Sequence, residues 1–323
     1  MAEPATIRRH WWAAALIGLV APGLGQLYTG RSRLAGLLVA AFFAFFALFL
    51  TGVPMTFAGF VFAFGGGLLV SWGGLIEAGL HAWRHTTVTR RSYHRWYVYV
   101  AYGMAFTLFT YGVNLGLLES VGLRSMFGFY QPFKVSSDSS LPNMMRGEYF
   151  FVARSTGEER RDPRAAIGYL AVVRWPGVEG EYVYRLLGVS GQRISVQDTV
   201  VSIDGQALPR RDLCTVHDVQ SGLTIRRSVE TLDGATHVMQ NFDDGSEFAR
   251  NADEVTVPGG QFFVMGDNRG NANDSRSRGP VANEDFVGRA LYVFWSNDWS
   301  RIGKSLVPGA EIDRAVYCSP GAK

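Results

Sequence analysis

The sequence predicts N-terminal membrane α-helices followed by a mainly antiparallel β-domain that lies outside the cytoplasm. Two observations carry this prediction. Residues 11–118 are almost entirely apolar or aromatic, whereas residues 123–323 contain most of the acidic residues and arginines. The second part is also divided into short runs of β-branched and aromatic residues. We therefore expect a membrane domain at 1–122 and a β-domain at 123–323.

Three segments of the first part have the composition of membrane spans. Residues 34–51 carry no charged side chain and are long enough for a helix to cross the bilayer. Residues 56–76 form a second span with three consecutive glycines that allow close helix contact, and residues 96–118 form a third that is rich in Tyr and Phe. Glu77 falls at a membrane edge, where a carboxylate can snorkel to water, so we interpret it as structural; a functional intramembrane acid is the alternative.

The orientation of these spans follows from the loop at 81–95. This loop contains four arginines, and loops rich in Lys and Arg remain in the cytoplasm. The third span then leaves the cytoplasm, which puts the residues after 118 on the far side of the membrane.

The first apolar segment, 11–29, is interrupted by Pro22, Gly23 and Gly25. Arginines flank it on both sides, at positions 8 and 9 and at positions 31 and 33. A helical hairpin that enters and leaves the membrane on the same side satisfies both flanks, and a fourth span is the alternative.

The second part of the chain predicts strands separated by Gly, Pro, Asp and Asn, as is typical of antiparallel β-domains. No segment of useful length with helical periodicity competes with them. Examples of these runs are 149–152, 169–173, 182–187, 199–203 and 261–265.

Charge and cysteine content exclude several classes of function. A formal net charge of +3 is too small to indicate a nucleic-acid partner, and the clustered positive residues lie beside apolar segments. The two cysteines, Cys214 and Cys318, form no CxxC motif, so neither a metal nor a redox site is predicted. A disulfide and two free thiols both remain open.

Two sequence motifs carry a family resemblance. Residues 133–148 read FKVSSDSSLPNMMRGE, and residues 266–276 read GDNRGNANDSR. They resemble, in order and spacing, the F-x-I-P-S-G-S-M-x-P-T-L-x-x-G-D and G-D-N-R-D-N-S-x-D-S-R motifs of bacterial signal peptidase I, a serine peptidase family with a Ser/Lys dyad. Between them, residues 168–176, 182–194 and 201–210 also match the family pattern. The resemblance implies that the extracytoplasmic β-domain is of the signal peptidase I type.

The resemblance also implies roles for particular residues. It places the nucleophile at Ser139, the oxyanion hole at Ser137 and the Ser139 amide, and a structural proline at Pro142. It implies no cofactor and no metal. The residues that would form the structural floor of the site are Gly266, Asp267, Asn268, Arg269, Asp274, Ser275 and Arg276.

The chain departs from the family at the general base. Tyr184 stands where the family has its catalytic lysine, and Ala272 stands where the family has the serine that holds the lysine amine. A phenol is a poor substitute, because burial raises its pKa. His217 and His237 are alternative bases, whereas Arg185 does not deprotonate in proteins. The resemblance also predicts that Tyr184 lies in side-chain contact with Ser139.

Other departures affect the same region. The three lysines of the chain, Lys134, Lys304 and Lys323, all lie outside the strand that should face Ser139. Near that serine, Asp138 replaces a glycine and Ser140 a methionine, and Gly270 replaces an aspartate in the second motif. We therefore expect weak peptidase activity or none.

The sequence thus predicts a signal peptidase I-like, membrane-bound serine peptidase for the signal sequences of exported preproteins, weak or inactive as it stands. The alternative is a non-catalytic homologue that binds exported polypeptides or assists envelope assembly. The implied partners are exported preproteins or other translocated polypeptides and the lipid bilayer, with no nucleic acid. The implied location is the bacterial inner membrane, with a multi-pass chain and a periplasmic C-terminal domain.

Overall fold

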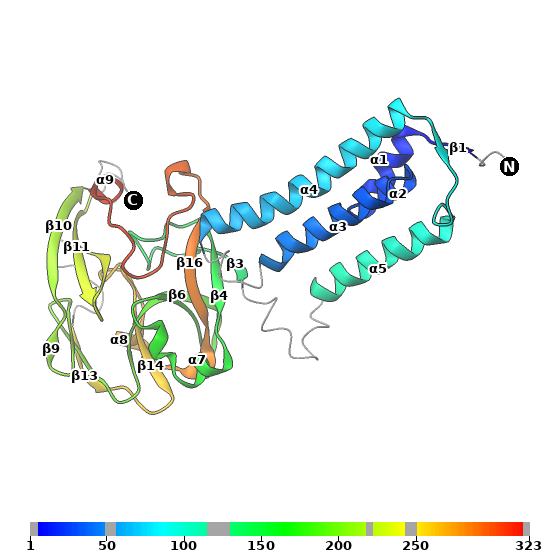
Figure 1. The fold of residues 1–323 in the computed structure, drawn as a ribbon. Coiled ribbons are helices and arrows are strands. Elements are labelled where there is room, and N and C mark those ends of the chain that lie inside the picture. Colours follow the sequence, from blue (N-terminus) through cyan, green and yellow to red (C-terminus); the bar gives the residue numbers. More distant parts are fainter. Residues whose placement is uncertain (1–5, 49–55, 115–129, 218–221, 243–250, 319–323) are drawn as a thin grey trace. The chain divides into compact units, whose positions relative to one another are not determined.

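The computed structural model describes residues 6–48, 56–114, 130–217, 222–242 and 251–318. The chain divides into two compact units, Met1–Gly128 and Phe129–Lys323. The boundary predicted at 122–123 lies outside the described residues. Figure 1 shows helices in the first unit and mainly strands in the second.

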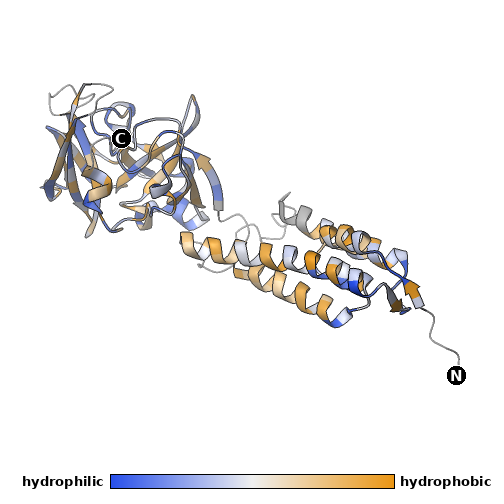
Figure 2. Ribbon diagram, turned by 90° about the horizontal axis from the view of Figure 1, so that it is seen from above, coloured by the Kyte–Doolittle hydropathy of each residue, from blue (hydrophilic) through white to orange (hydrophobic). Residues whose placement is uncertain are grey.

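The first unit is built from helices with one small strand pair. Strands β1 and β2 pair in antiparallel fashion, with Ile7 opposite Val88. Figure 2 shows hydrophobic residues along the helices and hydrophilic residues at the end that carries the N-terminus. The elements are β1 (Thr6–Arg8), α1 (Trp11–Val20), α2 (Leu24–Tyr28), α3 (Ser32–Ala47), α4 (Phe57–Arg84), β2 (Thr87–Thr89) and α5 (Trp96–Asn114).

Helices α1 and α2 form a helical hairpin that turns at Pro22 and Gly23. Gly23 has a positive φ of 83°, which suits glycine. Gly25 of α2 lies so close to α1 that a Cβ there would be 2.7 Å from the Ala14 carbonyl oxygen. The interruption that the sequence shows in this segment therefore reverses the chain direction, and the relation of this hairpin to the membrane stays a prediction.

Helix α4 is the only described helix that is long and apolar enough, by length and composition, to cross a membrane. It continues to Arg84, so residues 81–84 of the predicted loop are helical, whereas the membrane boundary of the predicted span 56–76 stays a prediction. Glu77 is neutralised within the fold, because Arg31 forms an ion pair with its carboxylate and Gln26 Nε2 donates to it at 3.0 Å. Helix α3 is shorter than the predicted span 34–51, and residues 49–51 and 115–118 of the predicted spans lie outside the described residues.

The second unit consists of three sheets whose strand pairs are antiparallel, which confirms the predicted mainly antiparallel β-architecture. The strand orders are β15-β14-β6-β5-β16-β4-β3, β13-β7-β8-β9 and β10-β11-β12. The strands are β3 (Tyr130–Lys134), β4 (Tyr149–Arg154), β5 (Leu170–Trp175), β6 (Val178–Val189), β7 (Arg193–Gln197), β8 (Val200–Ile203), β9 (Gln206–Ala207), β10 (Arg210–His217), β11 (Thr224–Leu232), β12 (Ala235–Phe242), β13 (Ala252–Thr256), β14 (Gln261–Met265), β15 (Val281–Ala282) and β16 (Phe286–Trp295).

Short helices connect these strands, and none of those described exceeds five residues. Because β5 lies in the middle of the largest sheet, both of its faces are buried. Ala171 and Val173 pack into one hydrophobic cluster, and Leu170 and Val172 pack into another. The connecting helices are α7 (Gly157–Arg161), η4 (Pro163–Ala166), α8 (Ser275–Arg278), η5 (Asn283–Asp285), η6 (Trp299–Arg301) and α9 (Arg314–Cys318).

The two cysteines are joined. A disulfide connects Cys214 of β10 to Cys318 of α9, with a Cα–Cα distance of 6.0 Å. Of the two states that the sequence left open, the structure shows the bridge, which fastens the C-terminal helix to the three-stranded sheet.

Candidate functional site

Ser137 and Ser139 lie on the loop that follows β3. Their Oγ atoms are 3.0 Å apart, so one hydroxyl donates to the other. Ser139 is buried, with 8% of its surface exposed, whereas Ser137 is exposed. Within the described ranges, the Ser137 hydroxyl is the only hydrogen-bonding partner of Ser139 Oγ. The loop therefore presents a hydroxyl pair with no general base in hydrogen-bonding reach.

The loop is closed at its base by backbone and side-chain bonds. Val135 N donates to Glu148 O at 2.8 Å, and Gly147 N donates to Val135 O at 2.9 Å. The buried Glu148 carboxylate accepts from Arg301 Nε at 2.5 Å and from Met145 N at 2.8 Å. A buried carboxylate with an arginine and a backbone amide is well compensated, so it holds the loop ends firmly.

The 266–276 segment supports the backbone of Ser139. Asn268 N donates to Ser139 O, and Asn268 Nδ2 donates to Asp138 O, both at 3.0 Å. A Cβ at Gly266 would lie 2.6 Å from Ser139 O and 2.4 Å from the Ala272 Cβ. Only glycine fits there. The Ala272 methyl carbon and the Ser139 carbonyl oxygen are thus separated by at most the sum of these two distances.

Asp267 joins this segment to β6 and to the serine loop. Arg185 donates to its carboxylate through Nε at 2.7 Å and through Nη2 at 2.6 Å. Asn143 Nδ2 donates to the same carboxylate at 2.7 Å. Both members of the ion pair are buried, so removal of either would leave an uncompensated charge.

Asp274 and Arg276 close the segment on itself. Asp274 accepts from Gly266 N at 2.8 Å and forms a buried ion pair with Arg276 at 2.8 Å. Ser275 Oγ accepts from Val264 N of β14 at 3.1 Å. The predicted floor residues thus occupy one connected network of turns and ion pairs.

The hairpin of β11 and β12 supplies partners that the sequence did not reveal. Arg269 Nη2 donates to Glu230 Oε2 of β11 at 2.6 Å, and its backbone N donates to Gln240 O of β12 at 2.9 Å. Burial alone raises the pKa of Glu230, but Arg269 and His237 outweigh it and hold that pKa well below the usual range. No motif marks Glu230, because residue 230 lies outside the segments that match the family pattern.

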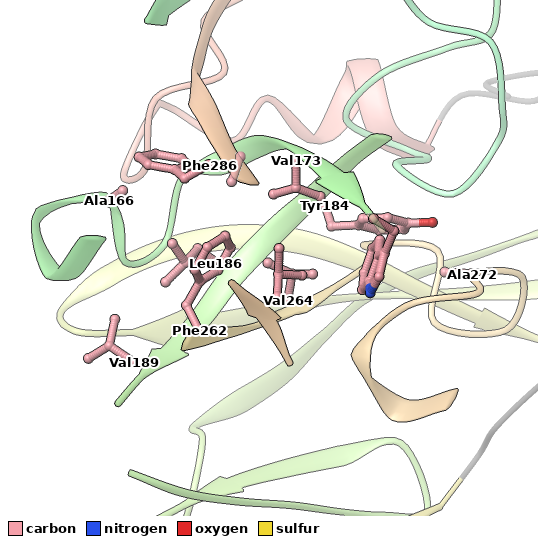
Figure 3. Close-up of a cluster of buried hydrophobic side chains, with 12 residues drawn as sticks. Ala166, Val173, Tyr184, Leu186, Val189, Phe262, Val264, Ala272 and Phe286 are labelled. Carbon is pink, nitrogen blue, oxygen red and sulfur yellow. The ribbon is translucent and has the colours of Figure 1, made fainter. Parts of the chain in front are cut away.

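Tyr184 fills the position of the missing lysine. Its side chain is buried, and its hydroxyl donates to Asn273 O at 2.9 Å. Trp175 lies edge-on to its ring at 5.6 Å between centroids, and Ala272 belongs to the same buried cluster. Figure 3 shows its hydroxyl directed away from the centre of this cluster. Burial, and then the Asp274 charge, raise the pKa of Tyr184 to about 12.

The serine loop approaches β6 beside this tyrosine. Ser140 Oγ donates to Val183 O at 2.8 Å, one residue before Tyr184. The predicted contact between the side chains of Tyr184 and Ser139 stays a prediction, and the Tyr184 hydroxyl is instead engaged by Asn273.

Among the described residues, neither histidine considered as a base hydrogen-bonds with Ser139. His217 is exposed at the end of β10. His237 is buried with Nε2 3.2 Å from Glu230 Oε2, and its pKa is lowered by burial and then by the Arg185 charge.

Lys304 contacts the loop that carries Ser139, but at Asn143. Its Nζ donates to Asn143 O at 3.0 Å, and its pKa is held well below the usual value by burial and then by the Arg301 charge. It lines a cavity of about 320 Å³ with Arg185 and His237. Because Arg185 follows Tyr184 in β6, its side chain leaves the opposite face of that strand. Lys134 is exposed beside Tyr149, and Lys323 lies outside the described residues.

Comparison with known proteins identifies the family. The family described as signal peptidase, peptidase S26, matches residues 109–295. The chain belongs to this family. That match includes both motifs, and it confirms the resemblance to signal peptidase I. Within the parts of the chain that the structure describes, no group of three or more His, Cys, Asp and Glu residues could hold a metal ion.

Several signal peptidases are similar to the chain. Signal peptidase I of Rickettsia prowazekii (strain Madrid E) is 31% identical over 137 residues, which are 40% of this chain and 52% of the relative. Signal peptidase I T of Bacillus subtilis (strain 168) is 27% identical over 170 residues, 51% of this chain and 74% of the relative. The probable signal peptidase I-1 of Synechocystis is 27% identical over 208 residues, which are 61% of this chain and 89% of the relative.

The chain spans about half the length of the Rickettsia relatives that it matches. A solved structure of a signal peptidase I from Enterococcus faecalis V583 has 24% sequence identity and a TM-score of 0.24, and the match covers 38% of this chain and 92% of that one.

Proposed function

We propose that this protein is a signal peptidase I-like membrane protein that binds the signal sequences of exported preproteins at the Ser139 loop and cleaves them slowly or not at all. In this proposal Ser139 is the nucleophile, and Ser137 with the Ser139 amide stabilises the oxyanion. The family membership and the Ser137–Ser139 hydroxyl pair support this assignment.

The state of Tyr184 carries the second half of the proposal. With a pKa of about 12, on the order of 10⁻⁵ of the phenol is ionised at pH 7. Its hydroxyl proton is also held by Asn273 O. Tyr184 therefore cannot accept the Ser139 proton at a useful rate, and a positioned general base is worth roughly 10² to 10⁴ in rate.

A membrane location with the β-unit outside the cytoplasm completes the proposal. In it, residues 1–122 form the membrane domain in the bacterial inner membrane, with spans at 34–51, 56–76 and 96–118 and a hairpin or a fourth span at 11–29. Residues 123–323 form the periplasmic domain. The apolar length of α4 supports insertion. The Cys214–Cys318 disulfide supports an oxidising compartment for the β-unit.

A second candidate is a non-catalytic homologue that binds exported polypeptides or assists envelope assembly. The observation that favours it is the hydrogen bond from the Tyr184 hydroxyl to Asn273 O. With this bond, Tyr184 has a partner, and Asp267 and Asp274 keep their own hydrogen bonds although no catalytic base is present. This candidate shares the fold and the partners of the first, and differs from it only in turnover.

Preprotein cleavage by the purified full chain in detergent separates the two. We expect turnover at least 10² below that of a signal peptidase with an intact dyad. Residual cleavage that disappears in Ser139→Ala supports the slow peptidase. Cleavage at background in both, with retained preprotein binding, supports the non-catalytic homologue. Rapid wild-type cleavage that Ser139→Ala abolishes contradicts both, because it requires a base that the structure does not provide.

A further inference from the structure

One end of the helical unit gathers basic side chains around a cavity. The cavity has a volume of about 430 Å³ and lies between the start of α3 and the end of α4. Its polar lining comes from Arg31, Glu77, His81, Arg84 and His85. Glu77, His81 and Arg84 are spaced by about one helical turn, so they project from one face of α4, and His85 follows directly at its C-cap.

The cavity carries net positive charge. Arg31 and Glu77 neutralise each other in an ion pair, and Gln26 donates to the same carboxylate. Arg84 forms no ion pair within the described part of the chain. The rings of His81 and His85 lie 4.7 Å apart between centroids. An arginine and two imidazoles therefore remain as donors for an anion.

Exposed aromatic side chains mark the same end of the unit. Trp11 and Trp12 begin α1, Trp83 lies near the end of α4, and Trp96 begins α5; all four are exposed. The Trp11 carbonyl oxygen lies close to Gly79 of α4, and β1 pairs with β2, so these helix ends are adjacent. Exposed tryptophans concentrate at the level of lipid headgroups.

We propose that this cavity binds the phosphate of an anionic phospholipid headgroup. The Arg84 guanidinium donates to the two non-bridging phosphate oxygens, and His81 and His85 donate to the free lone pairs of the same oxygens. Ile76 and Leu80, which are exposed on α4 and line the cavity on its apolar side, contact the first methylene groups of an acyl chain. The Arg31–Glu77 pair keeps a bare carboxylate from repelling the phosphate.

This inference rests on the proposed insertion of the helical unit in the bilayer, and not on the serine site. In the proposed orientation this end of the helical unit faces the cytoplasm. The cavity then lies at the cytoplasmic leaflet, which carries the anionic lipids that attract basic segments.

Native mass spectrometry of the detergent-purified full chain tests it. Phosphatidylglycerol and phosphatidylcholine with matched acyl chains are titrated separately, and inorganic phosphate is added in a further arm. We expect preferential retention of phosphatidylglycerol. Arg84→Gln should weaken retention roughly fivefold or more, since the charge-assisted contact that Arg84 makes inside the cavity is lost. The matched control is Arg90→Gln, which removes an exposed arginine of the same end that does not line the cavity.

Equal retention of the two lipids, or equal losses in Arg84→Gln and Arg90→Gln, would overturn the proposal. Inorganic phosphate that binds as tightly as the lipid would overturn the lipid assignment. A double variant, His81→Gln with His85→Gln, provides a second test if Arg84→Gln unfolds, and unchanged binding in it counts against the cavity. Ser139→Ala should retain the lipid like wild type, so failure of the peptidase proposal is distinguishable from failure of this one.

Discussion

Restoring the base at position 184 is the most direct test of why the site should be slow. Tyr184→Lys places an amine where the Tyr184 hydroxyl now donates to Asn273 O, near the Asp274 charge. A carbonyl acceptor and a nearby carboxylate both favour the protonated amine. We therefore expect Tyr184→Lys alone to raise cleavage by less than about tenfold, far short of the roughly 10² to 10⁴ that a general base supplies.

Adding Ala272→Ser supplies a second partner for the amine. Ala272 lies in the same buried cluster as Tyr184, and it faces the backbone of Ser139 across Gly266. A serine hydroxyl there can hold the neutral amine toward Ser139, so we expect the double variant to cleave roughly 10² faster than the single variant, or more.

The matched control is Tyr182→Lys with Ala272→Ser. Tyr182 stacks on Tyr184 at 6.3 Å between centroids and points the same way from β6, but it is two residues away. Loss of an aromatic pair costs about 0.5–1.5 kcal/mol in either variant, so thermal unfolding must be compared first. The assay is preprotein cleavage in detergent, with Ser139→Ala added to the double variant. A double variant no faster than the control would refute the reasoning.

Three further predictions concern stability and topology. Reduction of the Cys214–Cys318 bridge, which closes a sequence separation of 104 residues, should lower the free energy of unfolding by about 2–5 kcal/mol. Denaturant unfolding with and without reductant measures this change, and unchanged stability would contradict it. The folded state holds the pKa of His237 below its ordinary value, so the unfolded chain binds a proton first as the pH falls. Stability should therefore be full above about pH 6.5 and fall below it, and His237→Asn should flatten this part of the thermal-melting profile. A reporter fused at residue 88 should be cytoplasmic and one fused after residue 120 periplasmic, and the opposite pattern would reverse the proposed orientation.

The strand runs of the β-unit could be predicted because their local pattern agrees with the final burial. Residues 169–173 and 261–265 are mostly apolar, and they contribute to β5, in the middle of the largest sheet, and to β14, next to its edge. The strands β10 and β11 carry no such local pattern, since residues 210–217 and 224–232 mix arginines with apolar residues. Such strands are stabilised by their neighbours in the sheet, which sequence periodicity does not reveal.

The contacts of the candidate site were predictable where both residues lie in the two sequence motifs. They were not predictable where one of the two residues lies outside these motifs. Gly266 and Asn268 lie in a motif, and they contact Ser139. The motif identifies Arg269 but not its partner Glu230, which is distant in sequence and needs the folded hairpin to reach it. The partner of Glu77 was not predictable for a similar reason, because Arg31 lies 46 residues away in sequence, directly before α3.

The C-terminal segment belongs to the serine site through one chain of contacts. The disulfide fixes Cys318, and next to it Tyr317 donates its hydroxyl to Asn143 Oδ1 at 2.8 Å. Asn143 lies on the serine loop and donates to Asp267, which is paired with Arg185 of β6. A buried polar network is stable only when each member is satisfied. Loss of the Tyr317 hydroxyl would therefore leave Asn143 Oδ1 without this donor and so weaken the support of the Ser139 loop, although α9 is far from that loop in sequence.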